Sequence, residues 1–446
     1  MSSGSPSRTR YAIVGTGARA EMFVRALTGD HADHSELVAL ADTNPARTRY
    51  HNEALAARGL PPVAAYDAAD FLRMLDKERV DVALVATVDR THDAYIVAAL
   101  DAGRDVVTEK PMTVDAERCR AILDAVERSG RRVTVTFNYR YNPVHEAVRR
   151  VLAGGEIGEV GSVHFEWLLD TRHGADYFRR WHRDKANSGG LLVHKATHHF
   201  DLVNWWLGAV PERVYAEGRL FFYGEQGRRH GYARDYDRAH GSAEAAGDPF
   251  ALHLADAEGL RKLYLEAEEH DGYHRDQNVF APGVTIEDDL AVVVRYSTGA
   301  TMSYHLTAYS PWEGYRVMFN GSRGRLELEV VENDHVEPRD HGPKGASLHG
   351  AEAAAEQGWA KLRVHPFWRQ GYDVDLGDQT RDGHGGADGR MTAALFSPVT
   401  APDPLGRGAT ERDGALSLLT GLAANASLAT GAAVRVPDIL DLGDRL

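Results

Sequence analysis

This chain of 446 residues has a single cysteine, and it has neither a long apolar run nor an excess of basic residues. Its single cysteine, Cys119, forms no intrachain disulfide and excludes a multi-cysteine zinc or iron–sulfur site, which is typical of a reducing cytoplasm. No apolar run approaches the roughly 20 residues that a membrane-spanning helix needs. Residues 1–10 are polar, so we expect a disordered leader rather than a secretory signal. These absences predict a soluble, cytoplasmic protein that makes no membrane contact.

The charge balance argues against a nucleic-acid partner. Asp and Glu number 65 against 51 Lys and Arg, which gives a net charge of -14 with histidine neutral. Proteins that follow a phosphate backbone need a basic surface, whereas a small uncharged substrate is compatible with this balance. The chain is also longer than one hydrophobic core usually organises, so we expect two domains.

The first third of the sequence alternates short apolar runs with helical patterns. The runs lie at 10–15, 37–41, 80–86, 105–108 and 132–137. Buried parallel strands joined by crossover helices are the natural solution for such a pattern. We therefore expect a doubly wound α/β domain of the Rossmann type over residues 11–145.

A glycine turn joins the first run to a helical pattern. Gly15 and Gly17 permit a tight bend, and Ala20 holds the third position of the dinucleotide-binding fingerprint. Backbone N–H groups at the start of a helix attract a diphosphate. The turn therefore predicts cofactor contacts at Gly15, Gly17, Ala18 and Arg19.

Asp42 ends the second run, where the fingerprint expects an acidic residue. There it would accept hydrogen bonds from a ribose and repel a 2′-phosphate, so NAD is favoured over NADP as the cofactor. Alternatively, Asp42 caps the turn at Asn44 and Pro45.

The segment Glu109-Lys110-Pro111 follows the fifth run and precedes a helix. Together with the glycine turn, it resembles the Gfo/Idh/MocA oxidoreductases, the family of glucose-fructose oxidoreductase and inositol dehydrogenase. Other similar segments run from Phe137 to Pro143 and from Gly189 to Asp201. Thr87 and His92 also match, whereas Val88 and Asp89 stand where the family usually has Pro and Asn.

The resemblance implies an α+β domain over residues 146–446, built on a large, mostly antiparallel open sheet that holds substrate or a partner subunit. Segments rich in β-forming residues fit its strands; they lie at 160–169, 214–223, 290–296, 301–308, 315–320 and 325–331. The Gly-, His- and Asp-rich stretches 224–283 and 333–389 are expected insertions that fill no core themselves. They would serve as lids and substrate walls or as surface decoration.

The resemblance also implies roles for individual residues. Lys110 would orient substrate or nicotinamide and take part in proton transfer, with a pKa lowered by burial beside the nicotinamide, and a cis peptide would precede Pro111. The alternative is a surface salt bridge between Lys110 and Glu109. Further cofactor contacts are expected from Thr87, His92, Glu109 and Lys110.

His198 matches the family's catalytic histidine, whereas His194 stands where many members have aspartate. Residues four apart share a helix face, so these two rings could meet, with Asp201 orienting His198. We expect Lys110 and His198 to relay the proton and His194 or Lys195 to bind substrate hydroxyls. The expected catalytic residues are Lys110, His198 and His194, and the expected substrate contacts are Arg183, Lys195, Asp201, Tyr273 and His384.

The pair of histidines also permits a zinc site. However, the sequence has no His-Glu-x-x-His motif and the family normally uses no catalytic metal, so we expect none.

Three functions remain open at this point. The favoured one is an NAD-dependent dehydrogenase acting on a secondary alcohol of a sugar, cyclitol or glycoside. The second is a glycoside-cleaving enzyme that retains NAD and uses transient oxidation and elimination. The third is a non-catalytic nucleotide-binding regulator. An open sheet face needs cover, so we also expect a homodimer or homotetramer.

Overall fold

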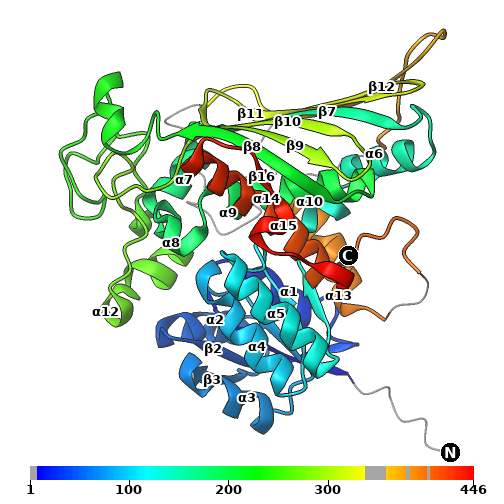
Figure 1. The fold of residues 1–446 in the computed structure, drawn as a ribbon. Helices are drawn as coiled ribbons and strands as arrows, with labels where there is room; N and C mark the ends of the chain where they lie inside the picture. The colour runs from blue at the N-terminus through cyan, green and yellow to red at the C-terminus, as the bar shows by residue number, and fades with distance from the viewer. Residues whose placement is uncertain (1–7, 337–357, 378–381, 399–401, 446) are drawn as a thin grey trace, which may run out of the picture.

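A computed structural model describes residues 8–336, 358–377, 382–398 and 402–445. The chain forms a nucleotide-domain-like α/β unit beneath a broad twisted sheet, with helices between them (Figure 1). None of the described helices is both long and apolar enough to span a bilayer.

The N-terminal unit is the predicted doubly wound sheet. Six parallel strands lie in the order β6-β5-β4-β1-β2-β3. They are β1 (Thr9–Val14), β2 (Ser35–Asp42), β3 (Ala64–Asp67), β4 (Val82–Val85), β5 (Asp105–Thr108) and β6 (Val133–Val135). The crossovers contain α1 (Ala20–Thr28), α2 (Pro45–Ala57), η1 (Ala68–Asp70), α3 (Phe71–Lys77), η2 (Asp89–Thr91), α4 (His92–Asp101) and α5 (Ala116–Ser129). The strand β1 already begins at Thr9, so Thr9 and Arg10 belong to the sheet and not to the expected disordered leader 1–10. Residues 1–7 lie outside the described residues.

The C-terminal part of the chain returns to this unit. The strand β15 (Ala409–Thr410) pairs antiparallel with β6. The helix α13 (Asp382–Phe396) packs its Phe396 ring edge-on against Tyr11, with 5.1 Å between ring centroids. The N-terminal domain therefore includes segments from the C-terminal part of the chain as well as residues 11–145. The expected insertion 333–389 includes the first residues of α13, which packs into the core of that domain.

The larger sheet has nine strands in the order β14-β13-β12-β11-β7-β10-β9-β8-β16. They are β7 (Val160–Asp170), β8 (Pro211–Arg219), β9 (Asp289–Tyr296), β10 (Thr301–Ser310), β11 (Glu313–Gly321), β12 (Gly324–Asn333), β13 (Trp359–Pro366), β14 (Tyr372–Asp373) and β16 (Val434–Arg435). Among the strands that the structure describes, only the central β7–β10 pair is parallel, so the predicted mostly antiparallel sheet is confirmed. The expected strand at 214–223 ends early, at Arg219. The strand β13 lies inside the supposed insertion 333–389, and its Leu362 and Val364 alternate with more exposed residues and pack into the core.

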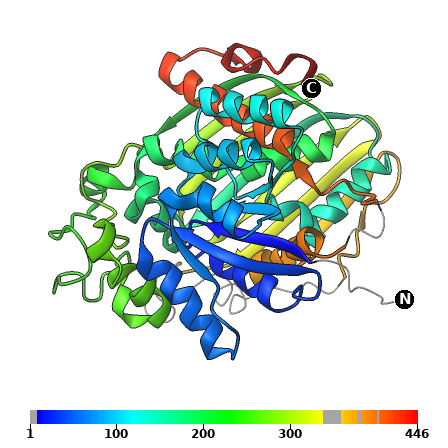
Figure 2. The same ribbon diagram turned by 90° about the horizontal axis from the view of Figure 1, so that it is seen from below.

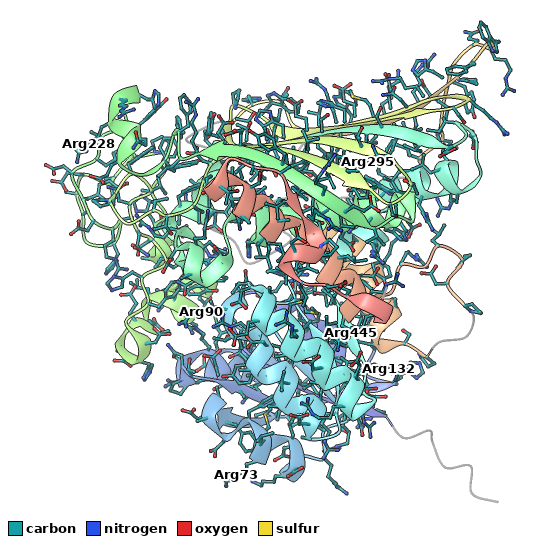
Figure 3. The ribbon with its side chains drawn as sticks, in the orientation of Figure 1. Arg73, Arg90, Arg132, Arg228, Arg295 and Arg445 are labelled. Atoms are coloured by element: carbon teal, nitrogen blue, oxygen red, sulfur yellow. The ribbon has the colours of Figure 1, made fainter. Side chains whose placement is uncertain are left out.

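Helices cover the face of this sheet that looks toward the N-terminal unit (Figures 1 and 2). They are η3 (Asn138–Tyr141), α6 (Pro143–Ala153), α7 (Thr171–Arg179), η4 (Trp181–Arg183), α8 (Lys185–Ser188), α9 (Leu191–His194), α10 (Ala196–Leu207), α14 (Glu411–Thr430), α15 (Val436–Ile439) and η9 (Gly443–Arg445). The other face is open: alternate residues of β9, including Val293 and Arg295, are exposed there (Figure 3).

The segment 224–283 was expected to fill no core, and this expectation is wrong. It contains η5 (Gly224–His230), η6 (Leu254–Asp256), α11 (Glu258–Leu260), the π-helical turn η7 (Arg261–Leu265) and α12 (Glu268–Asp271). Aromatic rings of Tyr232, Phe250 and Phe280 pack on one another, and a second cluster of leucines packs on Ala18. The apolar residues are spaced irregularly, so no helical or strand period reveals this packing in the sequence.

Candidate active site

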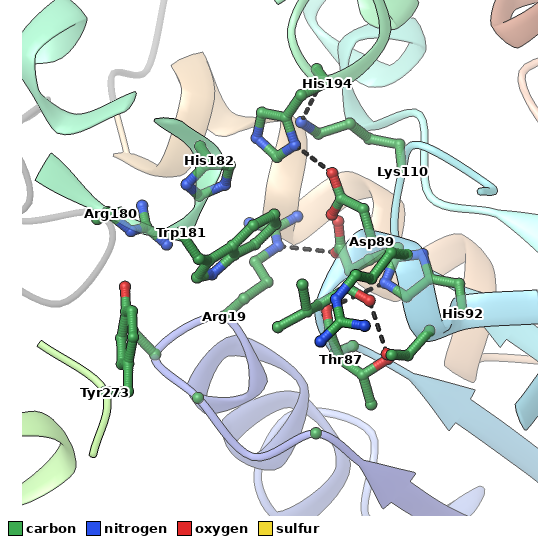
Figure 4. A pocket seen from close by; sticks show the side chains of 18 of the residues that line it. Arg19, Thr87, Asp89, His92, Lys110, Arg180, Trp181, His182, His194 and Tyr273 are labelled. Atoms are coloured by element: carbon green, nitrogen blue, oxygen red, sulfur yellow. Dashed lines mark hydrogen bonds and ion pairs between the residues drawn. The ribbon is translucent and has the colours of Figure 1, made fainter. Parts of the chain in front are cut away.

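A cavity of about 620 Å³ lies between the two sheets and the segment 224–283. Its floor is formed by loops at the carboxyl ends of the parallel strands, where open α/β sheets bind their ligands. Residues of α7, η4, α9 and α10 form its far wall, and Tyr264, Asp271, Tyr273 and Arg275 come from the inserted segment. Figure 4 shows these walls facing one another across the cavity.

The glycine turn is fixed by backbone packing. Gly15 has a φ of +85°, and a Cβ placed on it would lie 2.5 Å from the Thr87 nitrogen and 2.6 Å from the carbonyl of Ala86. Only glycine fits between these backbones. The turn therefore presents bare backbone to the cavity, as a bound diphosphate requires.

The carboxylate of Asp42 serves the local turn as well as the cavity wall. Its Oδ2 accepts hydrogen bonds from the Thr16 nitrogen and hydroxyl at 2.6 and 3.0 Å, and its Oδ1 accepts from the Asn44 nitrogen at 2.9 Å. Arg47 lies 3.4 Å away. The capping alternative is thus present, and Asp42 lines the cavity at the same time.

Glu109 faces another residue of the floor. Its Oε1 accepts a hydrogen bond of 2.7 Å from Nε of Arg19, and Arg19 also contacts Asp388 of α13 at 3.4 Å. The nearby charges of Glu109 and Asp388 outweigh the effect of burial and raise the pKa of Arg19. Glu109 forms its ion pair with Arg19, so the alternative of a surface salt bridge between Glu109 and Lys110 is not observed.

Lys110 is half-buried and lines the floor of the cavity. Its Nζ donates to the backbone oxygen of His194 at 3.0 Å, and a cis peptide joins it to Pro111. Burial lowers the pKa of Lys110 to about 8, although Asp89 and Glu109 act in the opposite direction. A lysine in this state exchanges a proton near neutral pH.

His194 forms a short pair with Asp89, a residue that was not among the expected site residues. Nδ1 of His194 lies 2.5 Å from Oδ2 of Asp89 (Figure 4). Burial, with help from Lys110, lowers the pKa of His194, and burial raises the pKa of Asp89. A neutral imidazole that donates from Nδ1 to this carboxyl group leaves Nε2 as its acceptor.

The expected meeting of His194 and His198 on one helix does not occur. The chain interrupts the helix at Lys195, so α9 ends at His194 and α10 begins at Ala196. His194 packs near His182, with 4.2 Å between ring centroids, whereas His198 stacks on Tyr139 at 4.3 Å. Both histidines nevertheless line the cavity.

Asp201 does not orient His198, because Arg140 binds both of its carboxylate oxygens at 2.8 and 2.6 Å. Burial raises the pKa of Asp201 to about 6, against the effect of Arg140. Asp201 is absent from the cavity lining, so it is misplaced as a substrate contact. The neighbouring His199 is fully buried, and its Nδ1 lies 2.7 Å from the Tyr304 hydroxyl, so it serves the packing of the fold.

Arg183 is also misplaced as a substrate contact. Its guanidinium donates to the backbone oxygens of Asn278, Ala281 and Pro282 and thereby anchors the inserted segment. Within the described part of the chain, it is Arg180, Trp181 and His182 of the same stretch that line the cavity. The short turn η4 directs Arg183 away, and this direction has no signal in the sequence.

The remaining expected residues divide into three groups. Lys195 and Tyr273 line the cavity, and Nζ of Lys195 donates to the Tyr139 hydroxyl at 3.2 Å. Thr87 and His92 also line it, but the His92 ring contacts the backbone oxygens of Pro111 and Thr87 at 2.9 and 3.1 Å. The side chain of His384 lies outside the described residues. Among the described residues, no cluster of three or more His, Cys, Asp or Glu could hold a metal ion.

Comparisons with known proteins agree with this fold and with a cofactor site at the glycine turn. Residues 9–137 match the NAD-binding Rossmann fold of an oxidoreductase family, and residues 149–351 match its C-terminal alpha/beta domain. The chain belongs to this family, the Gfo/Idh/MocA oxidoreductases. The chain is therefore an oxidoreductase, and dehydrogenases that act on CH–OH groups, such as inositol 2-dehydrogenases, are among its relatives.

Individual relatives place the chain within the family. It is 34% identical over 411 residues to the Bacillus subtilis oxidoreductase YteT, covering 88% of this chain and 89% of that one. It is 31% identical over 228 residues to the inositol 2-dehydrogenase of Rhizobium meliloti, covering 51% of this chain and 62% of that one. Among solved structures, the Bordetella pertussis WlbA dehydrogenase in complex with NADH and UDP-GlcNAcA has a TM-score of 0.62 at 19% identity, covering 96% of this chain and 99% of that one.

Proposed function

We propose that this protein is an NAD-dependent dehydrogenase that oxidises a secondary alcohol of a sugar, cyclitol or glycoside. The observation that carries the proposal is the convergence of Lys110 and the Asp89–His194 pair on one cavity whose floor is a glycine turn. A relative named as an inositol 2-dehydrogenase supports the substrate class.

The cavity residues fit a dinucleotide, because the glycine turn, Asp42 and Lys110 line one cavity at the carboxyl ends of the parallel strands. The nicotinamide would supply the hydride chemistry, and the protein would supply position and proton transfer. Lys110, in its neutral form, accepts the proton of the substrate hydroxyl. His194 accepts a hydrogen bond at Nε2 because Asp89 holds its Nδ1.

His198 is the second proposed member of the proton relay. Its ring lies in the far wall of the cavity, where it stacks on Tyr139 with 4.3 Å between ring centroids, and the Tyr139 hydroxyl accepts a hydrogen bond from Lys195 at 3.2 Å. His198→Ala tests this role. A variant that kept near-wild-type turnover on a confirmed substrate would remove His198 from the relay and leave the proton with Lys110.

The proposed cofactor is NAD rather than NADP. Asp42 places a carboxylate at the end of β2, and Arg47, the cation beside it, is paired with both Asp42 and Asp271. An arginine whose charge is neutralised by two carboxylates binds a 2′-phosphate only weakly.

The first experiment is incubation with NAD+ and a panel of sugars, inositols and glycosides, with nicotinamide absorbance and product masses followed in one sample. NADH that accumulates with a product lighter by two hydrogens supports the proposal. Cleavage of a glycoside without accumulated NADH supports the second candidate, an enzyme that retains its cofactor, which is favoured by the closure of the cavity by residues 252–275. Nucleotide binding with neither product would indicate a regulator.

We also propose that the protein is a homodimer or homotetramer that covers the open sheet face. That face carries Val293 and Trp359, which are 51% and 49% exposed. Light scattering at micromolar concentration tests this proposal, and a clean monomer contradicts it.

A further inference from the structure

Residues 252–275, here called the roof segment, belong to the C-terminal half of the chain but are fastened to the nucleotide domain. Leu260, Leu263 and Tyr264 pack around Ala18 of the glycine turn. The side-chain amide of Asn44 also donates to the backbone oxygen of Ala267 at 2.9 Å. The roof segment therefore lies directly against the loops that the proposed function assigns to the cofactor.

Tyr264 reaches the glycine turn itself. Its hydroxyl accepts a hydrogen bond of 3.0 Å from the backbone nitrogen of Ala18, and a Cβ on Gly17 would lie 3.5 Å from the same hydroxyl. Backbone amides of such a turn donate to the diphosphate of a dinucleotide. The Tyr264 hydroxyl thus lies where the turn expects an anionic oxygen.

Arg275 is a buried charge without a carboxylate partner. The residue is 4% exposed, lines the cavity, and has its guanidinium carbon 4.4 Å from the centre of the Tyr264 ring. Its Nε is buried and has no hydrogen-bond partner, and no ion pair joins Arg275 to any carboxylate of the described residues. An arginine stays charged in a protein, and a buried charge that lacks a partner is strongly unfavourable. This arrangement is completed by an anion.

Arg275 shares the charge of the Asp176 carboxylate with two other arginines. Asp176 is paired with Arg180 at 2.6 Å and with Arg179 at 3.6 Å. Burial would raise the pKa of Asp176, but Arg180, Arg275 and Arg179 hold it below its usual value. One carboxylate among these guanidinium groups leaves excess positive charge, and Nε of Arg180 is also buried without a partner.

We propose that Arg275, together with Arg180, binds the diphosphate of the cofactor from the side opposite the glycine turn, so that the roof segment is part of the cofactor site. The proposal rests on the proposed use of a dinucleotide. It implies slow cofactor exchange, because the dinucleotide leaves only after the roof segment separates from Ala18 and Asn44. An acidic group on the substrate has the same chemistry, so the experiment must separate the two sources.

The test compares Arg275→Gln with Arg228→Gln, a matched change at an exposed arginine of the same inserted segment (Figure 3). Calorimetry gives the Kd for ADP and for adenosine, and displacement gives the dissociation rate of NADH. We expect Arg275→Gln to weaken ADP at least tenfold and to speed NADH release by a similar factor, while adenosine binding and Arg228→Gln stay at wild-type values.

Two results overturn the proposal. An equal loss of ADP and adenosine affinity indicates a general disturbance of the fold. Unchanged ADP binding with a raised KM for an acidic substrate assigns the anion to the substrate instead. ADP binding requires no turnover, so unchanged ADP binding in Arg275→Gln overturns the proposal even if the protein oxidises no member of the substrate panel.

A measurement on the wild-type protein covers the case in which Arg275→Gln does not fold. Inorganic pyrophosphate should compete with ADP and raise the thermal unfolding temperature, and sodium chloride at equal ionic strength should do neither. Pyrophosphate that fails to displace ADP contradicts the proposal.

Discussion

The floor and the roof of the cavity are built in different ways. On the floor, the backbone of Gly15 packs against the backbone of Ala86 and Thr87, and there is no space for a side chain. On the roof, side chains of Tyr264 and Arg275 make the contacts, and they come from a segment inserted far along the chain.

This difference predicts different responses to mutation. A change to the backbone packing or to the reacting lysine of the floor should abolish folding or chemistry. A change to a side chain that only contacts the cofactor, on the roof or where floor and roof meet, should alter affinity or preference.

The largest effect is expected for Lys110→Met. A positioned proton acceptor contributes about 10²- to 10⁴-fold to a rate, so kcat should fall by that factor while NAD binding is kept. The wild-type rate should rise with pH through about 8, because burial lowers the pKa of Lys110 to about 8 and only the neutral amine accepts a proton. Lys361→Met, at a half-exposed lysine of β13, should leave the pH profile unchanged; a Lys110→Met enzyme with normal turnover contradicts the assignment.

Gly15→Ala should be the next most harmful change. Gly15 has a φ of +85°, and the added Cβ would lie 2.5 Å from the Thr87 nitrogen. We therefore expect the unfolding free energy to fall by roughly 3 kcal/mol or more and NAD binding to be lost. Gly130→Ala is the control, since its φ is +63° with no atom within 4 Å and its cost should be about 1–2 kcal/mol. Thermal unfolding of both variants separates steric clash from backbone strain. Equal losses would mean that the packing beside Gly15 has no special weight.

Sequence reasoning found the floor because its signals are local. Gly15 directly follows β1, Asp42 is the last residue of β2 and Lys110 lies two residues after β5, and parallel strands bring their carboxyl ends to one edge. The alternation of apolar runs and helical patterns predicted the parallel, doubly wound sheet.

Several contacts of the roof and the far wall escaped sequence reasoning because they depend on distant side chains. Asp89 pairs with His194, 105 residues away, and no spacing rule connects them. The stretch around Arg183 was recognised, but the turn η4 gives the cavity to Arg180 and sends Arg183 to carbonyl groups of the inserted segment. Such choices are set by tertiary packing, which a single sequence does not display.

Asp89→Asn tests the contact between the floor and the far wall, and it should have a moderate effect on the rate. It weakens the hydrogen bond that fixes His194, and a loss of about 1.4 kcal/mol would lower kcat about tenfold. The carboxylate of Asp89 raises the pKa of Lys110, so its removal should move that pKa below about 8 and shift the rising limb of the pH–rate profile to lower pH. Asp76→Asn, at an exposed carboxylate, serves as the control. A shift to higher pH would show that Asp89 does not act on Lys110.

The smallest effect is expected where floor and roof meet, at Arg47, which contacts Asp42 at 3.4 Å and Asp271 of the roof segment at 2.6 Å. In Asp42→Ala, the arginine loses its floor partner, and the carboxylate that opposes a 2′-phosphate is gone. The ratio of kcat/KM for NADP to that for NAD should therefore rise about tenfold, which corresponds to roughly 1.4 kcal/mol. Asp42→Ala combined with Arg47→Ala should reverse much of this gain, because it removes the cation that would bind the extra phosphate. If the double variant prefers NADP as strongly as the single one, repulsion by Asp42 alone sets the preference, and Arg47 serves only to hold the roof segment to the floor.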